Sequence, residues 1–218
     1  MPKTYEEYKY TEASWLKQIP ITWKQRKVRE IFIERRTKVS DKDYAPLSVS
    51  KAGIVPQLDT AVRTDNGDNR KLVKTGDFVI NSRSDRKGSS GISPYDGSVS
   101  LICIVLKPIT GENPAYLHHL LRSVPFTEEF YKNGKGLVSD LWTTKWDELK
   151  NILLPIPSRV EQDKIVRYLN WKISEMNHFV NQKKKQIKLL QELKITKINN
   201  VVTKGLDLNV KPELFTPA

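Results

Sequence analysis

Residues 158–204 have the sequence SRVEQDKIVRYLNWKISEMNHFVNQKKKQIKLLQELKITKINNVVTK, and this stretch decides the architecture of the chain. Pro155 and Pro157 come just before it and stop the preceding segment. Ser158 can cap the free N–H groups of a first helical turn, and Glu161 completes the pattern of a capping box. Gly205 is a natural helix stop. We therefore predict one continuous helix, about 70 Å long at ~1.5 Å per residue.

Apolar residues recur along this helix at alternating steps of three and four, the pattern of a coiled-coil seam. Lys183 fills the one skipped position, and the strict register ends after Leu190. A small domain is only about 30 Å across, so we expect the seam to pair with a second helix from another chain. The alternative is a helix folded back on its own domain. The residues predicted to form the dimer seam are Val166, Leu169, Ile173, Met176, Val180, Ile187 and Leu190.

The charge of the chain predicts an acidic partner. Its 218 residues carry a formal net charge of +12. Residues 159–204 alone hold 11 basic and 4 acidic side chains, with a cluster at Lys183, Lys184, Lys185 and Lys188. This cluster fits three interpretations: a solvated helix face, a contact with phosphates, or docking onto an acidic protein surface.

Other features of the sequence restrict the expected cellular location of the protein. No stretch has the ~20 consecutive apolar residues of a membrane span, and the first residues lack a secretory signal. Cys103 is the single cysteine, which excludes internal disulfides and fits a reducing, cytoplasmic location.

The region before the helix is predicted to be a small α+β domain. Short apolar runs alternate with turn residues, and the run 99–106 predicts the strongest strand. Residues 114–122 and 126–131 predict short helices, and Trp15 and Trp23 are expected to pack on the domain body. We predict a globular mixed α/β domain over residues 1–157. A long C-terminal coiled-coil helix over 158–204 and a tail over 205–218 follow it.

The best candidate site is the loop NSRSDRKGSSG at residues 81–91. Cations hold phosphates, the forked donors of arginine can contact guanine, and glycines allow close backbone approach. The alternative is a flexible, solvated loop. The predicted DNA-binding residues are Ser82, Arg83, Ser84, Arg86, Lys87 and Ser89, with weaker phosphate contacts from Lys51, Arg63, Lys135 and Lys145.

The sequence lacks the usual signatures of an enzyme site. It has no phosphate-binding glycine loop, no dinucleotide fingerprint and no Cys/His cluster with metal-ligand spacing. We therefore predict no cofactor, no metal and no catalytic residue. Asp140, Glu148 and Lys150 loosely resemble a metal-dependent nuclease motif, which leaves a stand-alone nuclease as a minor alternative. A protein-interaction adaptor that uses the basic helix is the other alternative.

Several groups of residues resemble type I restriction–modification specificity (S) subunits. One similarity lies in the helix and its start: LPIPSRVEQ at 154–162, with Ile165, Val166 and Leu169, then KQI at 185–187, LL at 189–190 and VVTKG at 201–205. The others are WLKQIP at 15–20 with Trp23, and GDFVI at 76–80 before the basic loop, both similar to a target-recognition unit.

This resemblance implies a non-catalytic subunit that recognises half of a split site in double-stranded DNA. The long helix would be the spacer. It also implies modification (M) subunits that methylate adenine and restriction (R) subunits that translocate and cleave. A full specificity subunit has two recognition domains and two spacer helices, whereas this chain has one of each. The resemblance is therefore to a half-length form, which explains the unpaired seam as the interface of a homodimer.

Overall fold

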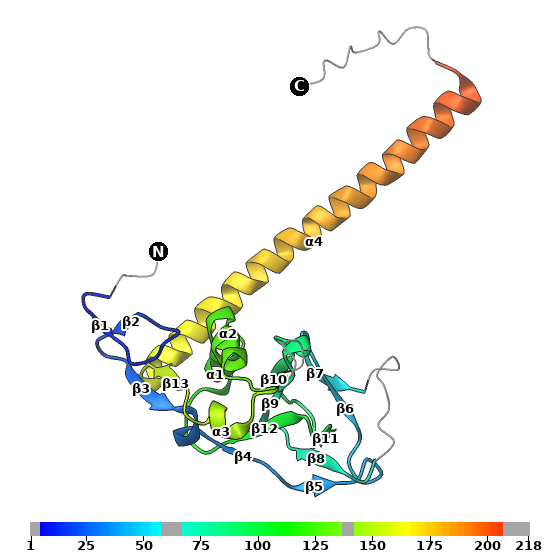
Figure 1. Ribbon diagram of the computed structural model, residues 1–218. Coiled ribbons are helices and arrows are strands. Elements are labelled where there is room, and N and C mark those ends of the chain that lie inside the picture. Colours follow the sequence, from blue (N-terminus) through cyan, green and yellow to red (C-terminus); the bar gives the residue numbers. More distant parts are fainter. Residues whose placement is uncertain (1–4, 58–66, 137–141, 207–218) are drawn as a thin grey trace. The chain divides into compact units, whose positions relative to one another are not determined.

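The computed structural model describes residues 5–57, 67–136 and 142–206. The chain divides into two compact units, Met1–Val166 and Arg167–Ala218. The first, called the body below, contains all the described strands and the shorter helices, and it also contains the first turns of the long helix α4, Arg159–Lys204 (Figure 1). The predicted fold class, an α+β region followed by one long C-terminal helix, is confirmed.

The body is built around a four-stranded antiparallel sheet with the strand order β10-β9-β12-β4. These strands are β4 Phe32–Glu34, β9 Phe78–Asn81, β10 Ser90–Ile92 and β12 Cys103–Pro108. A three-stranded sheet follows the order β11-β8-β5, with β5 Lys38–Val39, β8 Arg70–Val73 and β11 Gly97–Val99. The remaining strands form pairs: β1 Tyr8–Tyr10 with β2 Gln18–Pro20, β3 Lys24–Lys27 with β13 Leu153–Ile156, and β6 Leu47–Ser50 with β7 Gly53–Pro56.

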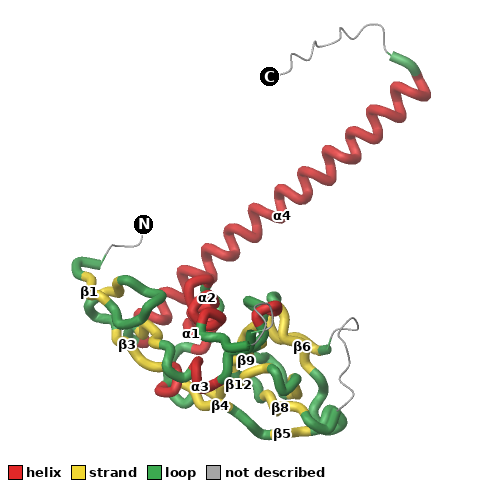
Figure 2. Tube along the Cα trace, viewed as in Figure 1, coloured by secondary structure: helices red, strands yellow, loops and turns green. Residues whose placement is uncertain are grey.

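The helices of the body are short (Figure 2). They are α1 Pro114–Leu121, α2 Val124–Lys132 and α3 Trp146–Leu149, with 3-10 turns at Val28–Glu30 and Ser84–Arg86. Asn113 caps α1 by accepting hydrogen bonds from the backbone N–H groups of Ala115 and Tyr116, at 2.8 and 3.2 Å. Within the described residues, no helix is long and apolar enough to cross a membrane.

Residues 78–80 and 103–106 of the two central strands are buried on both faces of the sheet, which matches the uninterrupted apolar sequence of these residues. Phe78 and Ile80 of β9 enter a large core cluster that also contains buried residues of α1, α2, α3, β13 and the start of α4. Val79, between them, enters a second cluster with Val73 and Val99. The alternation follows from successive strand side chains pointing to opposite faces.

The predicted single strand over residues 99–106 is wrong. The structure divides it into β11, which pairs with β8, and β12, which pairs with β9 and β4. A turn at 100–102 separates them, with the Cys103 N–H donating to the Ser100 carbonyl at 3.0 Å. The apolar run continues through the turn at Leu101 and Ile102, so hydrophobicity alone could not show the break.

The predicted tryptophan packing is confirmed. The Trp15 ring lies 5.9 Å from that of Phe126 and its indole N–H donates to the Leu153 carbonyl at 3.1 Å. The Trp23 indole N–H donates to Glu161 Oε1 at 2.9 Å. Glu161 also accepts a hydrogen bond from the Tyr5 hydroxyl. Burial, reinforced by this carboxylate, raises the pKa of Tyr5 to about 12.

The capping box predicted for α4 is therefore only half correct. The Ser158 hydroxyl accepts from the Glu161 N–H at 3.3 Å, as expected. The Glu161 carboxylate, however, hydrogen-bonds the N-terminal segment of the chain through Tyr5 and Trp23.

Gln162 anchors the first turn of α4 from inside the body, where its side chain is fully buried. Its amide Nε2 donates to the Pro157 carbonyl at 3.0 Å and to the Glu112 carboxylate, and its Oε1 accepts from the Asn113 N–H at 2.8 Å. Arg159 adds a hydrogen bond to the Gly111 carbonyl at 2.5 Å. The start of α4 is thus fixed to the segment that caps α1.

Replacing Gln162 with leucine tests this anchor. Q162L keeps most of the side-chain volume but leaves the Asn113 N–H and the Pro157 carbonyl without this partner. We expect the free energy of unfolding to fall by about 1–3 kcal/mol, measured by urea denaturation. V160A, at a position 65 % exposed in the same turn, is the control and should be nearly neutral. Equal stability of Q162L and wild type would contradict the anchor.

Candidate nucleic-acid interface

The loop after β9 is a defined turn. Residues Ser84–Arg86 form a 3-10 turn, and the Ser89 N–H donates to the Arg86 carbonyl at 3.0 Å. The Asn81 side chain accepts from the Arg83 N–H at 3.1 Å. Gly88 has φ +81, a left-handed conformation that favours glycine.

The cations of this loop are paired with nearby carboxylates. Arg83 forms a bidentate pair with Asp85, with both distances at 2.9 Å, and Arg86 lies 3.7 Å from the same carboxylate. Lys87 pairs with Glu128. Exposed ion pairs of this kind contribute little to stability, so phosphates could replace the carboxylates at small cost.

Two of the predicted serine contacts are buried. Ser82 is 4 % exposed and its hydroxyl donates to the Ile102 carbonyl at 2.5 Å, while Ser89 is 6 % exposed. In this conformation both side chains belong to the framework of the loop. Ser84 is half-buried, and its N–H donates to the Trp142 carbonyl at 2.9 Å.

The segment after residue 142 brings several predicted residues together. Thr143 pairs with Lys135 through two backbone hydrogen bonds of 3.1 Å and forms a bridge with Arg83. The next N–H, of Thr144, donates to the Ser82 carbonyl at 3.1 Å, and the exposed Lys145 follows. Residues that are separate in the sequence thus form one surface.

One other predicted residue, Lys51, is not joined to this surface. Lys51 lies in the turn between β6 and β7, where its carbonyl accepts a hydrogen bond from Arg122 at 2.5 Å. Arg63 lies outside the described residues.

A basic cleft of about 440 Å³ lies beside this surface, and of its lining residues only Ser82 and Lys145 are among the predicted DNA-binding residues. Its charged lining residues are Glu34, Arg36, Lys38, Lys71, Lys145 and Asp147, and its uncharged lining includes Leu101, Ile102, Thr143 and Trp146. A second hollow shares Thr143 and Lys145 and adds Lys135. Cations around a groove are what a phosphate backbone requires.

One signal in the sequence could have revealed this cleft. Glu34, Arg36 and Lys38 occupy alternate positions, and alternate residues of an extended segment share a face. The other lining residues come from β8, β12, Ser82 after β9, the 100–102 turn and residues 143–147, which only the fold brings together.

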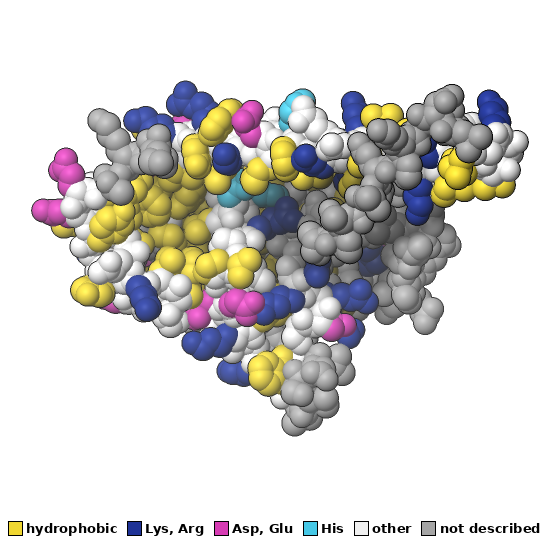
Figure 3. All heavy atoms as spheres, turned by 90° about the horizontal axis from the view of Figure 1, so that it is seen from above, with side chains coloured by type: hydrophobic (Ala, Val, Ile, Leu, Met, Phe, Trp, Pro, Cys, Tyr) yellow, Lys and Arg dark blue, Asp and Glu magenta, His cyan; other side chains and the backbone are white. Residues whose placement is uncertain are grey.

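The charges of the cleft are unequally neutralised. Glu34 binds Arg36 at 2.6 Å and Lys71 at 3.3 Å, and Lys71 also donates to the Cys103 carbonyl at 2.8 Å. Within the described part of the chain, the ammonium groups of Lys38 and Lys145 have no ion-pair partner. Apart from the cleft, the side chains visible in Figure 3 include Lys and Arg in more places than Asp and Glu.

The nuclease-like residues are held by other contacts. Glu148 accepts from the Lys145 N–H at 3.1 Å and pairs with Lys135 at 3.1 Å, while Lys150 pairs with Asp147 at 2.6 Å. Asp140 lies outside the described residues. Among the residues that are described, no group of three or more His, Cys, Asp or Glu is placed to hold a metal ion.

The predicted seam of α4 lies on exposed helix surface, except at its first two residues. Val166 is 9 % exposed and belongs to the core of the body, and Leu169 is half-buried. The other seam residues are 39–58 % exposed: Ile173, Met176, Val180, Ile187 and Leu190.

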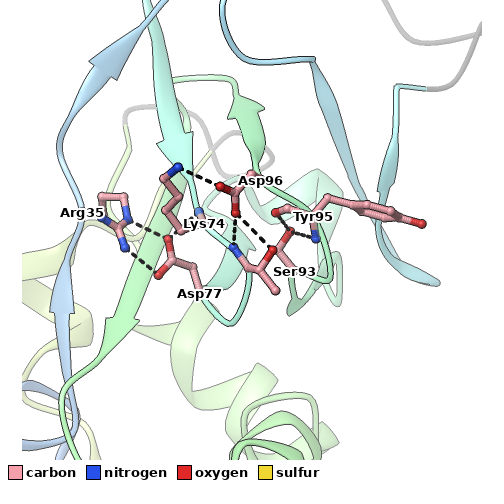
Figure 4. Close-up of polar contacts among 7 residues, drawn as sticks. Arg35, Lys74, Asp77, Ser93, Tyr95 and Asp96 are labelled. Atoms are coloured by element: carbon pink, nitrogen blue, oxygen red, sulfur yellow. Dashed lines mark hydrogen bonds and ion pairs between the residues drawn. The ribbon is translucent and has the colours of Figure 1, made fainter.

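A buried ion pair fixes the turn that precedes β9 (Figure 4). Asp77 is 2 % exposed and accepts from Arg35 Nε and Nη2, at 2.6 and 3.0 Å. The Lys74 N–H donates to the same carboxylate at 2.9 Å. Asp96 closes the turn outside, where Lys74 at 2.7 Å and the Thr75 N–H at 2.8 Å lower its pKa to about 2. β9, which leads into the basic loop, is thus held at its start.

Arg35→Ala should destabilise the protein by about 3–5 kcal/mol, because it leaves the buried Asp77 carboxylate without its cation. Denaturation in urea at neutral pH measures this. Arg36→Ala, which removes an adjacent arginine whose side chain is 69 % exposed, is the matched control and should cost less than about 1 kcal/mol. Similar effects of the two substitutions would contradict the assignment.

The fold of the chain is shared with known structures. No protein-family model and no curated protein matches this chain. The HsdS subunit of Thermoanaerobacter tengcongensis matches 91 % of this chain and 54 % of its own, with TM-score 0.66 and 19 % identity. A structure from a study of complex assembly and conformational transition of the type I R-M system matches 91 % and 49 %, with TM-score 0.60 and 14 % identity.

The type I restriction–modification S subunit of M. genitalium matches 82 % of this chain and 46 % of its own, with TM-score 0.51 and 14 % identity. The chain spans about half the length of these structures. It therefore has the fold found in type I restriction–modification specificity subunits, over about half of their length.

Proposed function

We propose that this chain is a DNA-recognition unit of a type I restriction–modification enzyme, which binds one half of a split target and pairs through α4 with a second copy. The observation that carries the proposal is the combination of the shared fold with a basic cleft beside the predicted recognition loop. In this proposal residues 1–157 recognise DNA, residues 158–204 form the spacer, and residues 205–218 form a tail.

The cations divide into two roles. Lys38 and Lys145 line the cleft without ion-pair partners among the described residues, which suits sequence-independent phosphate contacts. Arg83 and Arg86 lie on the adjoining loop and carry the forked donors that suit guanine edges. Asp85 holds both guanidinium groups in the free protein, and DNA would replace Asp85 as their partner.

The exposed seam supports pairing between copies. The seam positions are symmetric in the sequence about His178. Two antiparallel helices would therefore place Leu169 opposite Ile187 and Met176 opposite Val180. Each layer would then pair the first apolar position of the heptad, a, with the second, d. Lys183 would then face Ile173. In a parallel pair Lys183 would face its own copy, which brings like charges together. The pattern therefore favours antiparallel pairing.

A two-fold dimer predicts a symmetric target. Each body would contact one half-site, and the paired helices would set the distance between the halves. Methylation and cleavage would come from modification and restriction subunits, so the chain itself would be non-catalytic and would need no cofactor.

The DNA-binding residues separate by their effect on specificity. We expect Lys38→Ala and Lys145→Ala to weaken binding to all duplexes alike. Each should also reduce the slope of the logarithm of the binding constant against the logarithm of salt concentration by about 1. Arg83→Ala and Arg86→Ala should lose about 1–3 kcal/mol of discrimination between a selected duplex and random DNA. Fluorescence anisotropy over a series of KCl concentrations measures both quantities.

Lys24→Ala, an exposed lysine on β3, is the control for simple loss of charge. Equal losses from all variants would show that only net charge matters. Pairing through α4 without any DNA binding would instead favour the protein-interaction adaptor, with the Lys183–Lys185 cluster as its contact.

Introducing a charge into the seam should break the dimer. Met176→Glu or Val180→Glu places a carboxylate in the apolar layer at the centre of the pair, so sedimentation should change from twice 25.2 kDa to a single chain. His178 lies about 160° around the helix from both, so His178→Glu should remain dimeric. Dimers of unchanged stability in the seam variants would exclude the seam as the interface.

A further inference from the structure

Two aliphatic side chains are exposed inside the basic cleft. Leu101 and Ile102 form the turn between β11 and β12, are 39 % and 37 % exposed, and line the cleft with Arg36, Lys38 and Lys145. Exposed aliphatic residues are common singly, but an adjacent pair in a concave site where cations outnumber carboxylates calls for a ligand that is both anionic and apolar.

The turn is held rigidly from several sides. The Cys103 N–H donates to the Ser100 carbonyl at 3.0 Å, the Ser82 hydroxyl donates to the Ile102 carbonyl at 2.5 Å, and Lys71 donates to the Cys103 carbonyl at 2.8 Å. The two side chains are therefore presented from fixed backbone, and little ordering is needed on binding.

The size of the apolar area favours one class of ligand. A membrane surface would need a broad apolar face, whereas here two side chains lie in a cleft of about 440 Å³. Duplex DNA presents phosphates beside small apolar groups, because each thymine carries a C5-methyl group in the major groove.

We propose that Leu101 and Ile102 determine sequence preference by contacting the C5-methyl groups of thymine, while Lys38 and Lys145 hold the flanking phosphates. This inference rests on the proposed DNA-binding function and adds a base preference to it. It also assigns a role to the buried Ser82 hydroxyl, which fixes the Ile102 carbonyl and so positions the turn.

The test uses the full chain and duplexes selected from a random pool by the wild-type protein. Each thymine of a selected duplex is replaced in turn by deoxyuridine, which removes only the methyl group. We expect roughly three- to tenfold weaker binding at one or two positions, the size of effect that one buried methyl group gives. Leu101→Ser and Ile102→Ser should abolish this sensitivity at those positions, and Leu101→Met should keep it.

Ile109→Ser, at an aliphatic residue 48 % exposed outside the cleft, is the matched control and should retain the wild-type response. Urea denaturation shows whether each variant is folded. Variants that respond to deoxyuridine as wild type does, or a wild type that is insensitive at every thymine, would overturn the inference.

Two further results would also overturn it. Equal losses by Leu101→Ser and Ile102→Ser on selected and random DNA would show a structural role. The variants could also bend DNA less than wild type, as measured by energy transfer between the duplex ends. If this occurs without any effect of deoxyuridine, the residues wedge between bases and do not contact methyl groups. Failure of the wild type to bind any duplex would instead refute the proposed function itself.

Discussion

The buried amide of Gln162 joins three parts of the body: the proline segment before α4, the cap of α1 and the first turn of α4 itself. A buried amide is favourable only when its donors and acceptors are satisfied, so these hydrogen bonds fix where the helix begins. Glu161 joins the N-terminal segment to the same turn through Tyr5 and Trp23. The first turn of the long helix is therefore fixed to the body by hydrogen bonds of both Glu161 and Gln162.

The boundaries and type of α4 could be predicted because local signals decide them. Prolines precede it, Ser158 caps it and Gly205, with φ +77, follows it, so the predicted and observed helices agree within one residue. The partners of Glu161 could not be predicted, because Tyr5 and Trp23 are far away in the sequence. The break between β11 and β12 was missed for another reason: the turn itself is apolar, and exposure of Leu101 and Ile102 depends on the surrounding fold.

The candidate site shows the same division between local and tertiary information. The basic loop after β9 could be found from composition, since cations, serines and glycines are concentrated there. The pairing of its cations with Asp85 and Glu128, and the burial of Ser82 and Ser89, needed the structure. The cleft combines residues of β4 and β5, β8, the 100–102 turn and residues 143–147. A cleft that combines cations with the exposed side chains of Leu101 and Ile102 forms only where these segments meet.

Selection of duplexes from a random pool by the wild-type chain tests the central claim most directly. The account predicts that sequencing of the bound fraction yields an inverted repeat interrupted by a spacer of constant length, because two copies related by a two-fold axis each contact one half. A bound fraction with no enriched sequence, or with one uninterrupted and asymmetric motif, would contradict the proposal that this chain recognises DNA as half of a symmetric pair.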